Sequence, residues 1–474
     1  MPHNPVAEIE RIMQEIGAKC QVLAKRELRS PEDLRLLELE VAAVGRELSD
    51  RVTEAVVVAN VERLDESGAR TCEGTRSKGR RKTSFRLLNG RKVTVRARYR
   101  LPPRHSGSGR RRGTGRRGKA GRGCYPALAC LGIADRATPA LTSEVGWHAA
   151  EAASMEVARE ALARRGIDLD CKTICRLTYR LADRALRLRA ERMQAVGPGS
   201  APGPLAGKRV VASVDGGRLR VRSGERRGRR RAKTRRRGYR APWREPKVLT
   251  IYAIDERGRR DRRQLPLHDG TMNDADAVFA LIVGHLRLLG AADAAVLVLT
   301  GDGARWIWDR IDKLIAAVGI PRERFVAIVD FYHAVEHLQK VADLRANWST
   351  AERKVWMART KKLLRAGRME DVIRAIDDLR VGRRAKAMET ERNYFARNRE
   401  RMRYRDFERR GLPIGSGAVE SAVRRLVNLR LKSNATYWLE PNAEAVLHLR
   451  AVLKAGRWNE LASQAFALPV RWAA

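Results

Sequence analysis

Two apolar runs have β-strand character, and each ends in an aspartate that glycine follows at once. The first spans 209–215 and the second 295–302. A third apolar run ends at Asp330, and segments with helical spacing lie at 274–289 and 304–318. Strands that alternate with helices are typical of a sheet covered by helices. We therefore expect a mixed α/β fold.

The net charge indicates a polyanionic partner. Lys and Arg number 98 against 55 Asp and Glu, which gives a formal charge of +43. A charge of this size favours binding to nucleic acid or to an anionic membrane surface. The basic helices lack a continuous aliphatic face, and no apolar run reaches the length of about 18 residues that a membrane span needs. Nucleic acid is therefore the expected partner, with no membrane association.

The N-terminus and the cysteines bear on the compartment. The first residues lack the charged-then-apolar order of a signal peptide, so we expect a cytoplasmic protein. Six cysteines in 474 residues do not make a disulfide framework. Neither Cys124/Cys130 nor Cys171/Cys175 has C-x-x-C spacing, and no nearby histidines complete a zinc set. Structural zinc is not expected.

The N-terminal segment is predicted to be helical. Apolar residues recur at helical spacing over 8–27, and Ser30 is placed to cap a second helix that runs to about Leu64. The two helices form a helical hairpin or dimerisation arm, or else the second helix only docks on the rest of the chain.

A β-hairpin and a basic linker should follow. The pair Asn89-Gly90 is a turn signal within 84–100, where apolar residues alternate with basic ones. Residues 104–123 contain no acidic residue and almost no apolar one. Such a stretch cannot build a core, so we expect a flexible linker that follows DNA.

Residues 154–180 have the layout of a helix-turn-helix. A helix is followed by Gly166 and then by Asp170, which would cap a second short helix. Helical hairpins of this size are common, and the charge context favours a DNA-binding role. The shared core would consist of Val157, Ala161, Leu162, Ile174 and Leu177, while Lys172, Thr173 and Arg176 would point toward a major groove.

A Pro/Gly/Ser-rich stretch at 196–208 is the clearest domain boundary. Beyond it, an insertion follows the first strand, and ten of the fifteen residues 226–240 are Arg or Lys. We expect this insertion to clamp phosphates, through Arg229, Arg230, Arg235 and Arg236 among others. The six expected segments are 1–66 (helical arm), 67–123 (basic hairpin and Arg/Gly-rich linker), 124–200 (helix-turn-helix region), 201–333 (first part of the α/β core), 334–412 (helical block) and 413–474 (Glu420 helix and C-terminal helices).

Three carboxylates, Asp215, Asp302 and Glu420, form the candidate site. Cleavage and transfer of a phosphodiester need one oxygen activated and another stabilised across one phosphorus, which two Mg²⁺ ions about 4 Å apart can do. Carboxylate oxygens are the preferred ligands of such hard cations, so we expect Mg²⁺ or Mn²⁺. Each residue also has an ordinary interpretation. An Asp-Gly pair at a strand end is often a turn, and Glu420 can pair with Arg424 one helical turn on.

Asp330 and His333 form a second candidate pair. Asp330 competes with Asp302 as the second carboxylate, because both follow apolar strands. The pair could act as a proton relay or as a third metal site. Alternatively, His333 only donates a hydrogen bond to a carboxylate.

Four motifs occur in a fixed order along the chain, and together they resemble the DDE transposases of bacterial insertion sequences. The resemblance is to the Mutator-like superfamily and its ISKra-type family, and it extends over about 209–461. The motifs are D-G (215–216), G-D-G (301–303), D-F-Y-H-A-V-E-H-L (330–338) and G-S-G-A-V-E-S (415–421).

This resemblance implies the chemistry of the site. It assigns Asp215, Asp302 and Glu420 as the catalytic, metal-binding triad, with Asp330 and His333 as an accessory pair. It implies a ribonuclease-H-like catalytic domain with a large all-helical insertion before the glutamate. The helical arm, the basic β-hairpin and the helix-turn-helix would precede this domain.

The resemblance also implies the partners and the activity. Such enzymes bind double-stranded DNA, both transposon ends with terminal inverted repeats and target DNA, and they catalyse metal-dependent strand cleavage and strand transfer. A homodimer or higher multimer on DNA is implied, associated with the bacterial nucleoid when bound. Relatives often carry a cysteine-paired, zinc-ribbon-like segment after the N-terminal hairpin, which 100–113 lacks. The alternatives are a catalytically inactive, domesticated DNA-binding protein descended from a transposase, or an RNA-binding protein that prefers A-form duplex.

Further DNA contacts are expected around the last motif. Arginines near Glu420 would contact the DNA backbone, and nearby aromatic residues either stack on an unpaired base or pack in the core. The arginines are Arg424, Arg425 and Arg430, and the aromatic residues are Trp306, Trp308, Tyr437 and Trp438.

Overall fold

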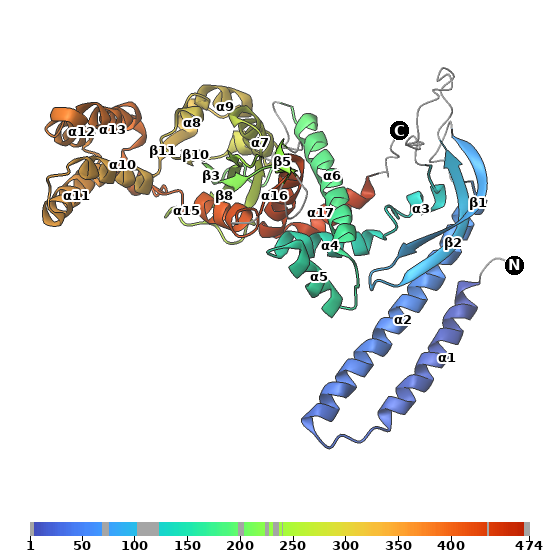
Figure 1. Cartoon of the computed structure of the whole chain (residues 1–474). Helices are drawn as coiled ribbons and strands as arrows, with labels where there is room; N and C mark the ends of the chain where they lie inside the picture. The colour runs from blue at the N-terminus through green and yellow to red at the C-terminus, as the bar shows by residue number, and fades with distance from the viewer. Residues whose placement is uncertain are drawn as a thin grey trace. The chain divides into compact units, whose positions relative to one another are not determined.

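The computed structural model describes most of the chain as two compact units (Figure 1). The first unit comprises Met1–Arg184 with Asn459–Ala474, and the second comprises Ala185–Trp458. The described residues are 4–68, 75–101, 123–197, 203–222, 227–230, 237–238, 240–433 and 436–468. Most of the predicted linker 104–123 lies outside them, as do Arg235 and Arg236.

The N-terminal arm is a helical hairpin, as one of the two alternatives predicted. Helices α1 (Pro5–Ala24) and α2 (Pro31–Glu66) lie side by side (Figure 1), and Ser30 caps the second with its side chain, as expected. The buried contacts between them involve Ile12, Ile16 and Ala55.

The predicted β-hairpin is confirmed and is longer than expected. Strand β1 (Arg76–Arg86) pairs antiparallel with β2 (Lys92–Leu101), and Gly90 adopts a left-handed φ of 84° between them. Alternate residues of β2, including Val93 and Val95, are buried against Val61 of α2. Basic residues occupy the opposite face of the hairpin.

Three helices follow in the first unit and share one core. They are α4 (Pro139–Glu151), α5 (Met155–Arg164) and α6 (Cys171–Ala195), after the short α3 (Pro126–Cys130). Leu162, Ile174 and Leu177 are buried there as predicted, and Ala161 is partly buried. Two expectations are wrong. Val157 is 47% exposed because Ala158 occupies the inward face of α5, and α6 is a long helix of 25 residues rather than a short one.

The second unit is built on a five-stranded mixed sheet, which confirms the mixed α/β class. The strand order is β11-β10-β3-β8-β9; β3, β10 and β11 are parallel, and β8 and β9 continue the sheet antiparallel. The strands are β3 (Arg209–Gly216), β8 (Lys247–Ile254), β9 (Leu267–Thr271), β10 (Val296–Gly301) and β11 (Phe325–Val329). The analysis of the sequence did not identify β9.

Helices pack on this sheet and extend beyond it. Helix α7 (Ala275–Leu288) packs on β8 and β9, α15 (Gly417–Val423) on β3 and β8, and α16 (Glu440–Lys454) on β9. The single helix expected over 304–318 is broken into two, because Asp309 ends the first segment. The other helices of this unit are α8 (Arg305–Trp308), α9 (Ile311–Val318), α10 (Phe331–Leu344), α11 (Thr350–Arg365), α12 (Met369–Asp377), α13 (Ala385–Asn398) and α14 (Tyr404–Arg409). Helix α17 (Trp458–Ala467) belongs to the first unit from Asn459 onward.

Short elements complete the second unit. A π-helical turn, η5 (Arg424–Asn428), continues α15. Two small ribbons pair β4 (Leu219–Arg220) with β7 (Trp243–Arg244), and β5 (Arg227–Arg230) with β6 (Arg237–Gly238). Single 3-10 turns are η1 (Ala291–Asp293), η2 (Arg322–Arg324), η3 (Gly382–Arg384) and η4 (Arg399–Arg401).

Candidate active site

The sheet topology brings the three carboxylates to one edge. Asp215 lies at the end of β3, and Asp302 follows the end of β10 directly. These strands are parallel neighbours, and Thr300 is in register with Ser213, so the next residues on both strands leave the sheet at the same edge. Glu420 lies on α15, which packs on β3 and β8.

The three carboxylates are electrostatically coupled. Burial, together with the negative charges of Asp302 and Glu420, raises the pKa of Asp215 to about 6. The backbone N–H of Gly216, 2.6 Å from Oδ1 of Asp215, and the nearby His333 oppose this shift. The ionised form of Asp215 is therefore disfavoured, because it adds a third negative charge to a partly buried group.

Short-range hydrogen bonds hold the other two carboxylates. Oδ1 of Asp302 accepts the N–H of Ala304 at 2.9 Å. Oε1 of Glu420 accepts the hydroxyl of Ser416 at 3.0 Å, and within the described residues Glu420 makes no ion pair with Arg424. The structure therefore does not contain the ion pair with Arg424 that is the simplest alternative role for Glu420.

Asp330 has a structural environment. It is fully buried and caps α10, with Oδ1 accepting the backbone N–H of His333 at 2.8 Å. Its Oδ2 accepts the backbone N–H of Ser416 and so ties α10 to the segment before Glu420. The imidazole of His333 lies 3.3 Å from Glu336 and not against Asp330. Both Asp330 oxygens are occupied by backbone donors, which favours Asp302 over Asp330 as the second free carboxylate.

The donor chemistry of the site suits a divalent cation. Three carboxylates with unrelieved mutual repulsion offer the hard oxygen ligands that Mg²⁺ or Mn²⁺ prefers. Over the described ranges, no group of three or more His, Cys, Asp or Glu side chains is close enough to hold a metal ion. The three side chains thus share an edge without forming a ready-made cage, and closing around a cation would require them to rotate.

The helical block reaches the site through Tyr394, which the sequence analysis missed. A Cβ added to Gly303 would lie 1.9 Å from Cε2 of Tyr394, so the ring packs directly on the residue after Asp302. His337 stacks on this ring with centroids 3.6 Å apart, and Glu391 hydrogen-bonds Nδ1 of His337 at 2.5 Å. Burial, followed by the charge of Asp302, raises the pKa of Tyr394 above its ordinary value. The only signal in the sequence was an aromatic pair within a charged helix.

This packing predicts the effect of Gly303→Ala. The added methyl must displace a buried aromatic ring, so the variant should lose about 1–3 kcal/mol of unfolding free energy. Chemical denaturation of both proteins measures the loss. Gly417→Ala is the matched control, because a Cβ there meets nothing within 4 Å and Gly417 opens a helix. A Gly303→Ala protein as stable as the control would contradict the contact with Tyr394.

The basic residues near Glu420 divide into exposed and partly buried ones. Arg424 is exposed on η5 and remains available for a phosphate. Arg425 is half-buried, with Nη2 lying 3.3 Å from Nε2 of His268. Burial, followed by the charge of Arg425, lowers the pKa of His268 to about 4. Neutral His268 therefore accepts from Arg425 and orients it.

Arg430 differs from the expectation. It is only 5% exposed, and its guanidinium lies over the ring of Trp438, so it packs in the protein rather than facing the backbone of DNA. Trp438 and Trp308 are buried too, and their indole N–H groups donate to the carbonyl oxygens of Leu431 and Asp302. Core packing, one of the two alternatives for the aromatic residues, describes these two tryptophans.

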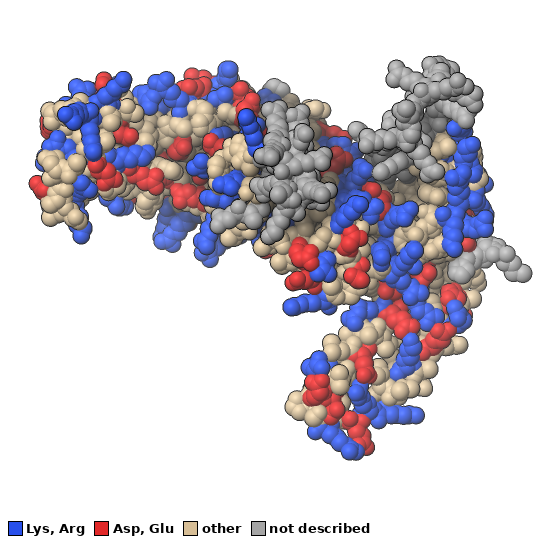
Figure 2. Space-filling model, viewed as in Figure 1, with Lys and Arg blue, Asp and Glu red and all other residues tan. Residues whose placement is uncertain are grey.

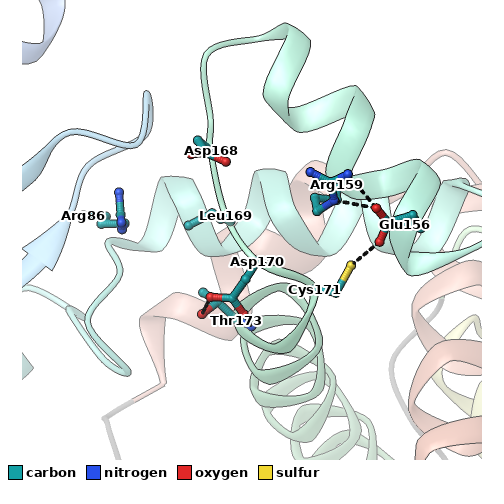
Figure 3. A pocket seen from close by; sticks show the side chains of 8 residues that line it. All are labelled: Arg86, Glu156, Arg159, Asp168, Leu169, Asp170, Cys171 and Thr173. Atoms are coloured by element: carbon teal, nitrogen blue, oxygen red, sulfur yellow. Dashed lines mark hydrogen bonds and ion pairs between the residues drawn. The ribbon is translucent and has the colours of Figure 1, made fainter.

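In the first unit, the start of α6 carries the residues predicted to face a groove. Lys172 and Arg176 are exposed. The hydroxyl and the backbone N–H of Thr173 both contact Asp170, which caps the helix as expected. A cavity of about 550 Å³ lies beside this helix start (Figure 3). Acidic and basic side chains both line it, namely Glu156, Asp168, Asp170, Arg86 and Arg159.

The cavity does not have the charge of an anion site. Glu156 accepts from Sγ of Cys171 at 2.9 Å and pairs with Arg159, as Figure 3 shows. The hydrogen bond to Glu156, with burial, raises the pKa of the Cys171 thiol to about 11. Cys171 is therefore a protonated donor at neutral pH.

Basic side chains gather on the β-hairpin of the first unit. Figure 2 shows Lys and Arg concentrated over β1 and β2. Arg96 and Arg98 alternate there with buried residues, and Arg80, Arg81 and Lys82 are exposed on the partner strand. Arg229 and Arg230 of the arginine-rich insertion lie on β5 of the second unit.

The comparisons identify no relative. Family models, curated proteins and solved structures all yield no match for this chain. Within the described residues, no helix is both long and apolar enough to cross a membrane.

Proposed function

We propose that this protein is a DDE transposase of the Mutator-like superfamily, ISKra-type family. It would cleave and join DNA strands at Asp215, Asp302 and Glu420 with Mg²⁺ or Mn²⁺. The observation that carries the proposal is the convergence of these carboxylates. They come from β3, β10 and α15, and Asp302 and Glu420 both act on the pKa of Asp215.

The architecture of the second unit supports a ribonuclease-H-like core. Its sheet joins three parallel strands to an antiparallel pair. The helical block, residues 334–412, lies between β11 and the Glu420 helix, where the resemblance places an all-helical insertion. Asp330 links the two ends of that block through Ser416, which would keep Glu420 near the strand ends despite the long intervening segment.

Asp215, Asp302 and Glu420 would hold a divalent cation next to the scissile phosphodiester. A bound divalent cation would supply activation of the attacking oxygen and stabilisation of the leaving oxygen. Asp215, whose pKa burial raises to about 6, would lose its proton more readily when a bound cation offsets the charges of Asp302 and Glu420. The site would then assemble as the cation and the DNA bind.

Double-stranded DNA, as transposon ends and target, is the proposed partner. The exposed Lys172 and Arg176 at the start of α6 would read the terminal repeats, in a helix-turn-helix role for α5 and α6. The basic hairpin, Arg424 and the arginine-rich insertion would contact backbone phosphates, which makes binding steeply salt-dependent. We propose a homodimer or higher multimer on paired ends.

Strand cleavage by an Asp302→Asn protein tests the proposal. The substrate is a DNA fragment that includes the sequence flanking the gene, incubated with Mg²⁺, and nicking is followed on denaturing gels. Replacing one carboxylate of a three-carboxylate site should lower cleavage by at least about 10²–10³-fold and leave DNA binding unchanged.

The control is Asp312→Asn, which removes an exposed carboxylate from α9 and should cleave like the wild type. Cleavage by Asp302→Asn at the wild-type rate would refute the assignment of Asp302. DNA binding by the wild type without any metal-dependent cleavage would instead identify a catalytically inactive DNA-binding protein.

A further inference from the structure

The hydroxyl of Tyr394 lies next to Asp302 without a hydrogen-bond partner. The residue is only 5% exposed, and no described residue accepts from its Oη. Buried polar atoms in native proteins nearly always have a partner, so an unsatisfied one needs an explanation. A role in a functional state that supplies the partner is one such explanation.

Asp302 offers an acceptor close to this hydroxyl. Its Oδ1 accepts from Ala304, whereas its Oδ2 accepts from no donor among the described residues. Gly303, the next residue, lies under the Tyr394 ring; a Cβ at this position would be 2.8 Å from Oη. The charge of Asp302 is also the first side-chain charge that acts on this hydroxyl, ahead of Asp330. A buried hydroxyl without a described partner therefore lies beside a carboxylate oxygen that accepts from no described residue.

The ring is held so that its hydroxyl cannot turn elsewhere. His337 stacks on one face, nearly parallel at 13°, and Phe395 packs edge-on against the ring. Glu391, one turn earlier on α13, fixes His337 in turn. A phenol ring clamped in this way positions its donor without losing side-chain freedom when the hydrogen bond forms.

We infer that Tyr394 is a positioning residue for Asp302: in the substrate-bound site its hydroxyl donates to Oδ2 of Asp302. The inference rests on the proposed function. It gives the helical block a direct role in the site, because α13 supplies the group that sets the direction of the second carboxylate. Asp302 must rotate when the carboxylates close around a cation, and Tyr394 selects the rotated orientation.

The test compares Tyr394→Phe with Tyr404→Phe. Tyr404 is the matched control, because it is fully buried in the same helical block and its hydroxyl has no described partner either. It packs against Phe331 rather than on Gly303. The measurements are kcat and KM for Mg²⁺-dependent strand cleavage, and the Tm of each metal-free protein.

The expected result separates function from stability. Tyr394→Phe should lower kcat by about 10- to 100-fold, as loss of an orienting partner does, with KM for DNA within about twofold of wild type. Its Tm should be unchanged or higher, since the variant loses a buried hydroxyl that has no partner. Tyr404→Phe should keep the wild-type kcat.

Three results would overturn the inference. Wild-type kcat in Tyr394→Phe would show that the hydroxyl does not act on Asp302. An equal loss of kcat in both variants would indicate a general effect of buried hydroxyls. A wild-type protein that does not cleave DNA would refute the proposed function and this inference together, whereas the first two results leave the proposed function intact.

Discussion

Asp215→Asn is expected to abolish strand cleavage and, at the same time, to stabilise the metal-free protein above about pH 6. Folding raises the pKa of Asp215 from 3.8 to about 6, mainly through burial. A raised pKa means that the folded state holds the proton more tightly, so ionisation lowers stability as the pH rises from about 4 to 6. Two pKa units correspond to at most about 3 kcal/mol. Asparagine does not ionise, so the unfolding free energy of the variant does not fall in this way as the pH rises.

The measurement is urea unfolding of wild type and Asp215→Asn in EDTA at pH 4.5 and pH 8. The variant should be more stable at pH 8, and the difference should shrink at pH 4.5, where wild-type Asp215 is protonated. Asp312→Asn is again the control, because its carboxylate is exposed on α9 and lies outside the site. Lower stability of Asp215→Asn at pH 8 would contradict the repulsion among the three carboxylates. Retained cleavage would remove Asp215 from the proposed site.

The strands predicted from the sequence share one property that β9 lacks. The segments of β3, β8, β10 and β11 are continuous apolar runs, which buried parallel and central strands require. In β9, residues 267–271 are all buried, yet they include histidine, aspartate and glycine. Partners from helices far away in the sequence bind Asp269, and no local pattern encodes those partners. The strand was therefore not predictable from periodicity.

The candidate site, like the sheet, was predictable from the sequence only where its features have a local signal. The strand-end positions of Asp215 and Asp302 follow from local sequence, and parallel neighbouring strands then bring them to one edge. The capping role of Asp330 also has a local signal. Aspartate is common immediately before a helix, where its side chain accepts a backbone N–H of the first helical turn. The contact between Tyr394 and Gly303 has no local sequence signal, because it depends on how the helical block packs against the end of β10.

A buried polar network surrounds Asp269 of β9. Asp269 is 1% exposed and accepts from Nη1 of Arg189 at 2.8 Å, from Nε2 of His285 at 2.8 Å and from Nδ1 of His448 at 3.2 Å. Burial alone would raise its pKa. The charge of Arg189 and the two histidine hydrogen bonds outweigh burial and hold the pKa of Asp269 well below its ordinary value.

Asp269→Asn should therefore destabilise the second unit severely. It removes one of the two carboxylates that pair with the buried Arg189, the other being Glu444 at 2.8 Å, and loss of a partner from a buried ion pair costs up to about 3–5 kcal/mol, a large share of a typical unfolding free energy. Because the folded pKa is depressed, the contribution of Asp269 is full above about pH 4 and is lost as the pH falls further. Urea midpoints at pH 7 and pH 3 should thus differ more for wild type than for the variant. Asp312→Asn, which removes an exposed carboxylate from α9, should leave the midpoint unchanged. An Asp269→Asn protein with the wild-type midpoint at pH 7 would mean that Glu444 alone is a sufficient partner for Arg189, and that β9 does not depend on Asp269.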